Sequence, residues 1–279
     1  MPLVTQALAM IFVFSTMLGV GLTLRLSEIS GSLQDRGWLA RALLANFVML
    51  PAVAFGVARL LQLDPALTAG LLILATAPGG PVLIKLAALA KGDHALTVGL
   101  LVTLLVLGVF TQPLILPMLL QAVSVDSTTI VLTLIVSVLA PLLSGMALCA
   151  RKPLMAQAWH RAAQRTSTLS MLLICILLPI AHWQELQDIS GSGAFRAAAL
   201  FLLLACLGGW LLGGPHPGPR RILSINCALP NLAAAVVIAS QNFSDPRVVL
   251  MLLVILLVSI PFVVPLCLLF ARQQREITR

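Results

Sequence analysis

Charged side chains are scarce in this 279-residue chain, where Asp, Glu, Lys and Arg together make up 9% of the sequence. No polar stretch is long enough to fold by itself, which excludes a separate soluble domain. The nine acidic residues all fall outside the apolar stretches of membrane-spanning length, and the four histidines lie in loops or near the ends of such stretches. A Ser or Cys at membrane depth therefore has no acidic or histidine partner to activate it. This excludes an intramembrane hydrolase, leaves a histidine proton relay without support, and predicts no catalytic residues.

The chain also lacks a cysteine framework. Its five cysteines are odd in number, lie in apolar segments and show no metal-ligand spacing: Cys149, Cys175, Cys206, Cys227 and Cys267. Such residues are typical of small buried hydrophobes rather than of a disulfide or zinc scaffold. The sequence therefore predicts neither a metal site nor a cofactor.

Hydrophobic residues are what the chain has in abundance, at 60% of the sequence with a mean hydropathy of +1.07. This composition predicts an all-α polytopic membrane protein embedded in a lipid bilayer. Basic residues in the loops explain the net charge of +8, so a nucleic-acid partner is not expected. Nine membrane-spanning helices are predicted, the first read as a retained span rather than a signal peptide. They lie near residues 4–24, 38–61, 65–90, 95–121, 128–150, 166–183, 194–213, 222–243 and 247–271.

The distribution of basic residues predicts the orientation in the membrane. The chain has seventeen Lys and Arg residues. With nine spans, thirteen of them fall on the side of the membrane that holds the C-terminus, and three (Arg59, Arg196 and Arg247) fall on the opposite side. The remaining one, Lys85, lies inside the third predicted span. Basic residues accumulate in cytoplasmic loops. We therefore expect an inner (cell) membrane protein with the N-terminus outside and the C-terminus in the cytoplasm.

Two of the predicted spans contain helix-breaking sequence at their centres. The third holds Pro78, Gly79 and Gly80, and the eighth holds Pro230 beside Asn231. Proline removes a backbone donor and glycine relaxes the helical constraint, so neither centre favours a regular helix. Unpaired backbone groups at membrane depth are tolerated only inside protein or along a watery cavity. Each break is therefore a candidate binding site, with a kinked helix that binds nothing as the alternative.

The sequence around the two breaks repeats. Fifteen residues separate Pro78 from the next Asp, the same interval separates Pro230 from its next Asp, and each following span carries Pro-x-x-x-Pro. The repeat pairs the third span with the eighth and the fourth with the ninth, an offset of five spans. Because successive spans alternate in direction across the membrane, an odd offset gives the two copies opposite orientations. We therefore predict an inverted repeat in which two discontinuous helices cross. The copies are about 4–121 and 128–271, within a single transporter unit of residues 1–279.

Lys85 is the basic residue that lies inside a predicted span. A charge at membrane depth is costly, so an intramembrane lysine is by default a functional hypothesis. The half-helices that begin near Pro81 and Pro230 would add two positive dipole ends, and all three features favour an anion. The alternative is that Lys85 extends toward the cytoplasm beside Lys91, about 9 Å along a helix. Other polar residues could bond a substrate or one another: Asn46, Thr76, Thr97, Asn226 and Asn231.

Several motifs, in this order, resemble the bile acid:sodium symporter family. They are Gly19-Val20-Gly21-Leu22-Thr23-Leu24, Ala45-Asn46-Phe47 through Pro51, Pro78-Gly79-Gly80, Ala90-Lys91-Gly92-Asp93, the Pro113 to Pro117 element and Asn231-Leu232-Ala233. The resemblance covers nearly the whole chain and is closest to members that lack an extra first helix. It implies a panel domain and a core domain that holds the crossing helices, with alternating access between the two.

The sodium-binding positions of that family are not kept. Sodium-coupled members have a Ser-Asn pair just after Pro-Gly-Gly, where this chain has Leu83 and Ile84. They have a glutamate and a glutamine in the second crossing helix, where this chain has Asn226 and Pro230. At three further positions of the comparison, this chain has Asn46 where a glutamine is usual in the family and Thr97 where the family has a serine. Asn231 is the same residue as in the family. The comparison implies that two sodium sites are absent and that the single charge of Lys85 replaces them.

The predicted function is secondary transport of a small organic anion by alternating access, without sodium coupling; proton coupling through Lys85 stays open. The alternatives are a sodium-coupled symporter of bile acid-like or other organic anions, and a passive channel. A channel is disfavoured because no ring of charges or repeated pore motif is present. The predicted substrate-binding residues are Lys85, Asn46, Thr76, Pro78, Gly79, Gly80, Thr97, Asn226, Pro230 and Asn231.

Overall fold

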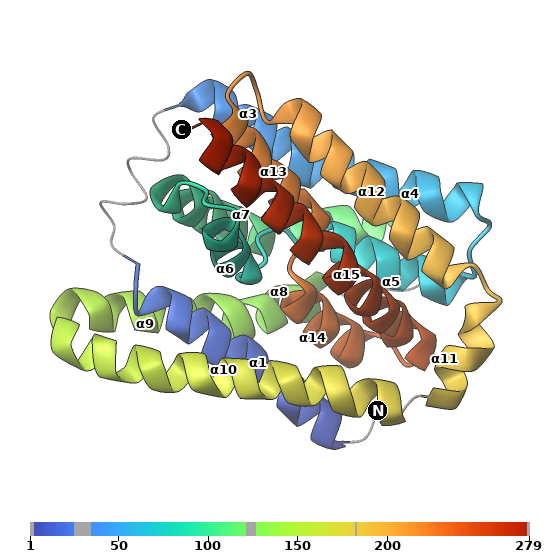
Figure 1. The fold of residues 1–279 in the computed structure, drawn as a ribbon. Coiled ribbons are helices and arrows are strands. Elements are labelled where there is room, and N and C mark those ends of the chain that lie inside the picture. Colours follow the sequence, from blue (N-terminus) through green and yellow to red (C-terminus); the bar gives the residue numbers. More distant parts are fainter. Residues whose placement is uncertain (1–2, 25–34, 121–126, 182, 278–279) are drawn as a thin grey trace.

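A computed structural model describes residues 3–24, 35–120, 127–181 and 183–277, and throughout these ranges the regular elements are helices (Figure 1). Arg25 and Arg279, two of the basic residues counted in the topology prediction, lie outside the described residues. The all-α prediction is confirmed for the described ranges.

The helices, in chain order, have the following bounds. They are α1 (Leu3–Gly21), α3 (Arg36–Leu44), the π-helical η1 (Ala45–Met49), α4 (Leu50–Leu60), α5 (Pro65–Ala75), α6 (Val82–Leu89), α7 (His94–Leu119), α8 (Ser127–Leu134), the π-helical η2 (Ile135–Leu139), α9 (Ala140–Arg151), α10 (Pro153–Ala181), α11 (Trp183–Ser190), α12 (Ala194–Leu212), α13 (Pro217–Ala228), α14 (Leu232–Asn242) and α15 (Pro246–Ile277).

Seven helical stretches of the described chain are long and apolar enough to cross a membrane. They are Arg36–Leu60, His94–Leu119, Thr128–Arg151, Pro153–Ala181, Ala194–Leu212, Pro217–Asn242 and Pro246–Gln273. Two shorter apolar helices, Ala7–Gly21 and Pro65–Ala75, fall within the predicted first and third spans. The chain is therefore built as a polytopic membrane protein, and the count of nine spans stays a prediction.

Three acidic residues of the described chain cap the starts of helices. The side chains of Asp35, Asp64 and Asp93 accept hydrogen bonds from Trp38 N, Ala66 N and Leu96 N, each at 2.9 Å, at the starts of α3, α5 and α7. A capping carboxylate satisfies an amide that the helix itself leaves unpaired and complements the positive end of the helix dipole. These acids are thus used at helix ends, which fits their absence from the apolar stretches.

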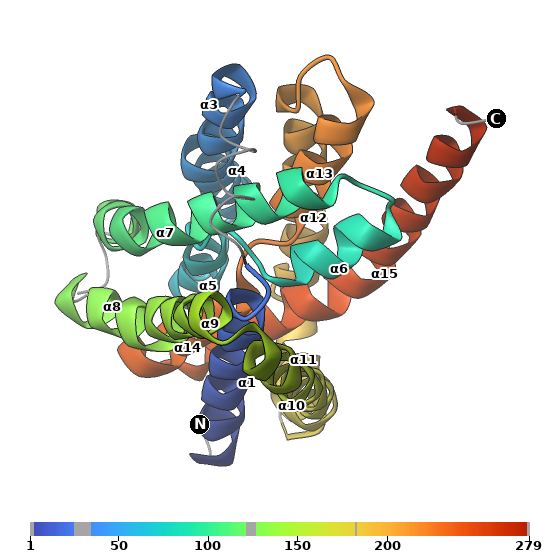
Figure 2. The ribbon, with the colours of Figure 1, turned by 90° about the vertical axis from the view of Figure 1, so that its left-hand side faces the viewer.

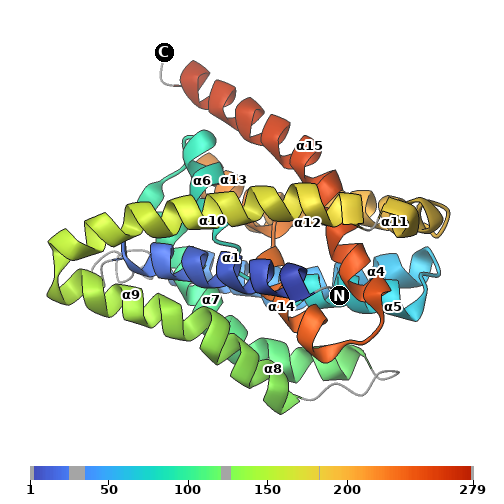
Figure 3. The same cartoon turned by 90° about the horizontal axis from the view of Figure 1, so that it is seen from below.

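The helices pack into two groups (Figures 2 and 3). In the first group, α1, α8, α9 and α10, the helix α1 packs against both α9 and α10. Their backbones come close at two glycines, since a Cβ on Gly145 would lie 2.7 Å from the carbonyl oxygen of Leu18 and one on Gly21 would collide with the backbone at Leu142. The second group holds α3–α7 and α12–α15, in which α12 packs on α13 and α15 packs on α5 and α12.

Helix α10 differs from its sequence prediction. The sequence predicted a span that begins only at residue 166 and ends at 183. The structure has one continuous helix, Pro153–Ala181, in which Trp159 is exposed. The segment from Leu154 to Arg165 is rich in Ala, Gln and Arg, which have high helix propensity, so nothing interrupts the helix before the apolar part begins.

An ion-pair cluster joins the starts of α5 and α15. The guanidinium of Arg247 lies 3.0 Å from Asp64 Oδ2 and 2.8 Å from Asp245 Oδ2. The hydrogen bond from Arg247 holds the pKa of Asp245 below its ordinary value of 3.8. All three side chains are partly exposed, so the pair contributes modestly to stability.

This shift predicts a pH dependence of stability. Because the pKa of Asp245 is lower in the folded protein, its contribution is complete above about pH 3.8 and is lost as pH falls through the folded-state value. We expect Asp245→Asn to lower the melting temperature slightly at pH 7 and to flatten its decline below pH 4. Melting curves of purified protein between pH 3 and pH 7 measure this. Parallel native and Asp245→Asn curves over that range would contradict it.

Candidate functional site

The first predicted break lies between α5 and α6. Helix α5 ends at Ala75, and the chain from Thr76 to Pro81 is fully buried before α6 begins at Val82. Gly79 has φ +78°, a left-handed conformation that side-chain-bearing residues rarely adopt. The Pro-Gly-Gly-Pro sequence therefore forms an irregular segment in the protein interior, as predicted.

The second predicted break lies between α13 and α14. Helix α13 ends at Ala228, and Leu229, Pro230 and Asn231 separate it from α14. Asn231 is 2% exposed, and its Oδ1 accepts a hydrogen bond of 3.1 Å from Ala234 N, so its side chain caps the start of α14.

The two breaks are in contact. The backbone N–H of Asn231 donates to the carbonyl oxygen of Ala77 over 2.7 Å. A Cβ on Gly80 would lie 2.8 Å from the carbonyl oxygens of both Leu229 and Pro230. The structure thus brings together the predicted residues Gly80, Pro230 and Asn231, and it sets the N-terminal ends of α6 and α14 beside the same contact.

Two buried amides, 180 residues apart in sequence, form a pair beside the second break. Asn46, in the π-helical segment η1, donates from Nδ2 to the carbonyl oxygen of Ala42 at 2.8 Å, and its Oδ1 accepts from Nδ2 of Asn226 at 2.9 Å. Both residues are at most 1% exposed. Within the described chain, Oδ1 of Asn226 has no hydrogen-bond partner. A buried acceptor without a donor is uncommon and marks a position where a ligand could bind.

Thr76 and Gln112 are linked beside the first break. Thr76 Oγ1 donates to the carbonyl oxygen of Leu72 at 2.8 Å, while Nε2 of Gln112 lies 3.2 Å from the carbonyl oxygen of Ile73 and 3.5 Å from Thr76 Oγ1. Gln112 was not among the predicted binding residues. Its position directly before the first proline of the Pro-x-x-x-Pro element is the signal that could have identified it.

Thr97 is buried, but the structure does not join it to the other predicted residues by a hydrogen bond. Its Oγ1 donates to the backbone carbonyl of Asp93 at 2.6 Å, in the first turn of α7. This bond has the local i to i−4 geometry common for threonine in helices.

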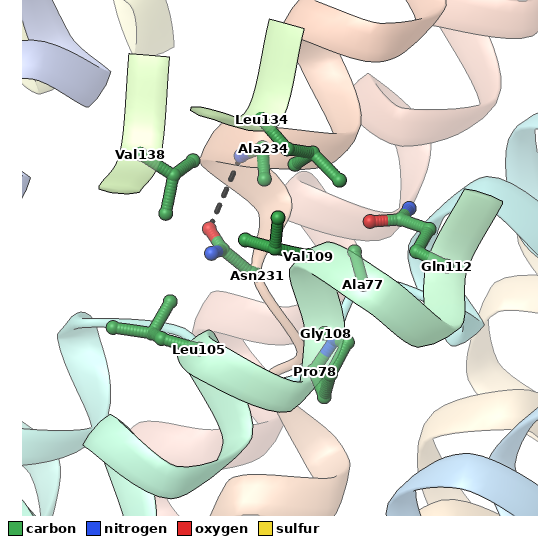
Figure 4. Close-up of a pocket in the computed structure, with 10 residues that line it drawn as sticks. All are labelled: Ala77, Pro78, Leu105, Gly108, Val109, Gln112, Leu134, Val138, Asn231 and Ala234. Atoms are coloured by element: carbon green, nitrogen blue, oxygen red, sulfur yellow. Dashed lines mark hydrogen bonds between the residues drawn. The ribbon is translucent and has the colours of Figure 1, made fainter. Parts of the chain in front are cut away.

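A small pocket adjoins the first break and separates it from the first helix group. Figure 4 shows Ala77, Pro78 and Asn231 on one side, Gln112 at one end, and Leu134 and Val138 of the first group on the other. Its free volume is about 10 Å³, room for about one water molecule. Little free space therefore remains between the first break and the residues of α8 and η2 that line this pocket.

Lys85 lies on α6 with its side chain exposed rather than buried among other residues. Its Nζ is 3.5 Å from Oγ1 of Thr168 on α10, so it faces the first helix group. In the part of the chain that the structure describes, no carboxylate forms an ion pair with Lys85. The sequence identified the lysine as a candidate but could not identify its neighbour on α10.

Few side-chain oxygen atoms near the breaks are free to bind a cation. Hard cations prefer carboxylate, carbonyl and water oxygens. The side-chain oxygens of Asn46 and Asn231 already accept hydrogen bonds, which leaves Asn226 Oδ1 as the unpaired buried side-chain oxygen. Among the described residues, no three His, Cys, Asp or Glu side chains lie close enough together to hold a metal ion.

Apolar helices, two of them interrupted by buried irregular backbone in mutual contact, are an arrangement typical of secondary transporters. The chain belongs to the Sodium Bile acid symporter family, whose model matches residues 10–190. This match confirms the resemblance noted in the sequence, and it covers the first break but ends before the second. The family's description and the relatives' names are those of transporters rather than of enzymes.

Three relatives show the level of similarity. The chain is 29% identical to the probable sodium/metabolite cotransporter BASS1, chloroplastic, of Arabidopsis thaliana, over 83% of this chain and 58% of the relative. It is 27% identical to the probable sodium/metabolite cotransporter BASS2, chloroplastic, of Oryza sativa subsp. japonica, over 83% of this chain and 56% of the relative. It is 24% identical to the uncharacterized sodium-dependent transporter YocS of Bacillus subtilis (strain 168), over 84% of this chain and 74% of the relative. The chain thus spans little more than half the length of the two plant relatives.

Proposed function

We propose that this protein carries a small organic anion across the membrane by alternating access and without sodium coupling. The observation that supports this most directly is the charge at the contact between the breaks. The N-terminal ends of α6 and α14 meet there, Lys85 lies on α6, and the described apolar stretches hold no acidic residue.

Each of these features favours negative charge. A helix N-terminus carries about half a positive charge from its unpaired amides, and such ends point at anionic groups in transporters with broken helices. Lys85 adds one full charge without a carboxylate partner in the described ranges. An organic anion is therefore a better fit than a neutral or cationic solute.

Alternating access requires two bodies that move relative to each other. We propose that the group α1, α8, α9 and α10 is the panel, and that the group α3–α7 with α12–α15 is the core. Three polar contacts of the described chain link them: Thr133 Oγ1 to Gln241 Oε1 at 2.8 Å, Gln241 Nε2 to Met10 Sδ at 3.7 Å, and Lys85 to Thr168 at 3.5 Å. The nine spans, the inverted repeat, the inner membrane and the cytoplasmic C-terminus belong to the same proposal and rest on the sequence pattern.

Sodium-coupled transport is the second candidate, and one observation favours it. The unpaired Oδ1 of Asn226 is an oxygen that a cation could bind, and the relatives above carry sodium in their names. Asn226 also stands where sodium-coupled members have a glutamate, so any remaining site would have lost its carboxylate.

Sodium replacement distinguishes the two candidates. We expect substrate binding to purified protein to be unchanged when sodium is replaced by potassium or choline at constant ionic strength, because the described site offers too few free oxygens. Constant ionic strength matters because salt screens an anion from Lys85. A thermal shift that requires sodium, saturates at millimolar concentration and disappears in Asn226→Leu would instead support sodium coupling.

A further inference from the structure

Thr168 on α10 faces Lys85. Thr168 is exposed and lies 3.5 Å from the Lys85 ammonium, although it sits in the apolar half of α10. Its own hydroxyl hydrogen is donated to the carbonyl oxygen of Gln164 at 2.8 Å, so toward Lys85 the hydroxyl oxygen acts as an acceptor. The contact fixes which face of α10 looks toward α6.

Arg165 belongs to the same face of α10. It lies three residues before Thr168, and residues three apart in a helix are surface neighbours. Arg165 is exposed, and in the described chain no carboxylate pairs with it. A second cation thus lies about 4.5 Å along the helix axis from the residue that Lys85 contacts.

The two cations come from different helix groups, Lys85 from α6 and Arg165 from α10 (Figures 2 and 3). Two positive groups on neighbouring helices, neither with a carboxylate partner in the described chain, repel each other until an anion binds between them. One carboxylate of the anion could pair with the ammonium of Lys85, and a second could accept the fork of the Arg165 guanidinium, which suits a planar carboxylate.

From this geometry we propose that α10 supplies half of the anion site, with Arg165 and Thr168 opposite Lys85, and that the site selects short dicarboxylates over monocarboxylates. This inference rests on the anion transport proposed above and specifies its substrate class. The rise of about 4.5 Å from Arg165 to Thr168, the residue that Lys85 contacts, fits two carboxylates separated by a few carbon atoms. Binding the two ends of one anion would also draw α6 and α10 together.

The test compares succinate with butyrate, which has the same chain length and one carboxylate. Affinities are measured on purified full-length protein and on Arg165→Gln, Thr168→Val and Thr168→Ser. The control is Arg151→Gln, because Arg151 is an exposed residue at the end of α9 and its loss changes the net charge equally. The three mutated positions are exposed, so none of the changes disturbs the buried core.

The native protein is expected to bind succinate at least tenfold more tightly than butyrate. Arg165→Gln should weaken succinate more than tenfold and butyrate less than twofold, while Arg151→Gln changes neither. Thr168→Val should weaken both ligands about threefold, and Thr168→Ser should restore them. Equal losses in Arg165→Gln and Arg151→Gln, equal native affinities for the two acids, or no binding of either acid would each overturn the inference.

The outcome for Lys85 separates this inference from the proposed function. If Lys85→Met weakens the binding of organic anions while changes in α10 do not, the α10 half of the site is wrong and anion transport stands. If Lys85→Met also has no effect, the proposed anion site itself fails.

Discussion

Replacing Lys85 by methionine is expected to weaken anion binding more than tenfold, a loss of about 1.4 kcal/mol or more. Methionine keeps the length of the side chain and removes the charge, which has no carboxylate partner in the described chain. Lys85→Arg should restore only part of the affinity, because a rigid planar fork does not replace a compact point charge. The measurement is the dissociation constant of the transported anion at constant ionic strength.

Lys91→Met is the matched control for this prediction. Lys91 is exposed and lies six residues after Lys85, just beyond the end of α6. It changes the net charge by the same amount, so it reports any general loss of surface potential. If the two methionine variants lose the same affinity, Lys85 acts only through overall charge and is not a binding residue.

Gly80→Ala is expected to abolish transport and to destabilise the protein by about 1–3 kcal/mol, the usual cost of overpacking. The added Cβ would lie 2.8 Å from the carbonyl oxygens of Leu229 and Pro230. Both obstacles are backbone atoms, and the adjacent bond from Asn231 N–H to Ala77 O holds the two breaks together, so neither side can move away easily. Thermal unfolding and uptake into proteoliposomes measure the two effects.

Gly56→Ala provides the control, because a Cβ at Gly56 in α4 would meet nothing within 4 Å. Alanine is the better helix former by about 0.5–1 kcal/mol, so this variant should be as stable as the native protein or slightly more stable. A Gly80→Ala protein that melts and transports like Gly56→Ala would show that the two breaks are not packed as described.

The positions of the two breaks could be predicted because their causes are local. Pro78, Gly79 and Pro230 interrupt a helix wherever they occur in a sequence, and the structure has irregular backbone at both sites. The contact between the breaks could be anticipated only through the repeat, since Asn231 and Ala77 are more than 150 residues apart in the chain. Local sequence thus predicted where the chain is irregular, and symmetry predicted that the irregular parts meet.

The partners of individual side chains could not be predicted in the same way. Asn46 and Asn226 were each identified as candidates, but their hydrogen bond depends on how η1 packs beside α13. Lys85 was predicted either to bind an anion at membrane depth or to extend toward the cytoplasm, and neither interpretation identified α10 as the helix that it faces. Thr168 could not be predicted as a neighbour of Lys85, because a threonine in an apolar helix commonly donates its hydroxyl to a carbonyl oxygen of the same helix. Thr168 also does this, to the carbonyl oxygen of Gln164.

The uncompensated charge of Lys85 also has an electrical consequence. If the core moves Lys85 across part of the membrane, the empty carrier carries a positive charge through the field, at about 2.3 kcal/mol per elementary charge for each 100 mV. A bound monoanion would cancel that charge and a dicarboxylate would reverse it, so voltage would act differently on the unloaded protein and the loaded one. A negative interior would then retain the empty carrier in its inward-facing state, and the membrane potential itself would set how often the site returns to the outside.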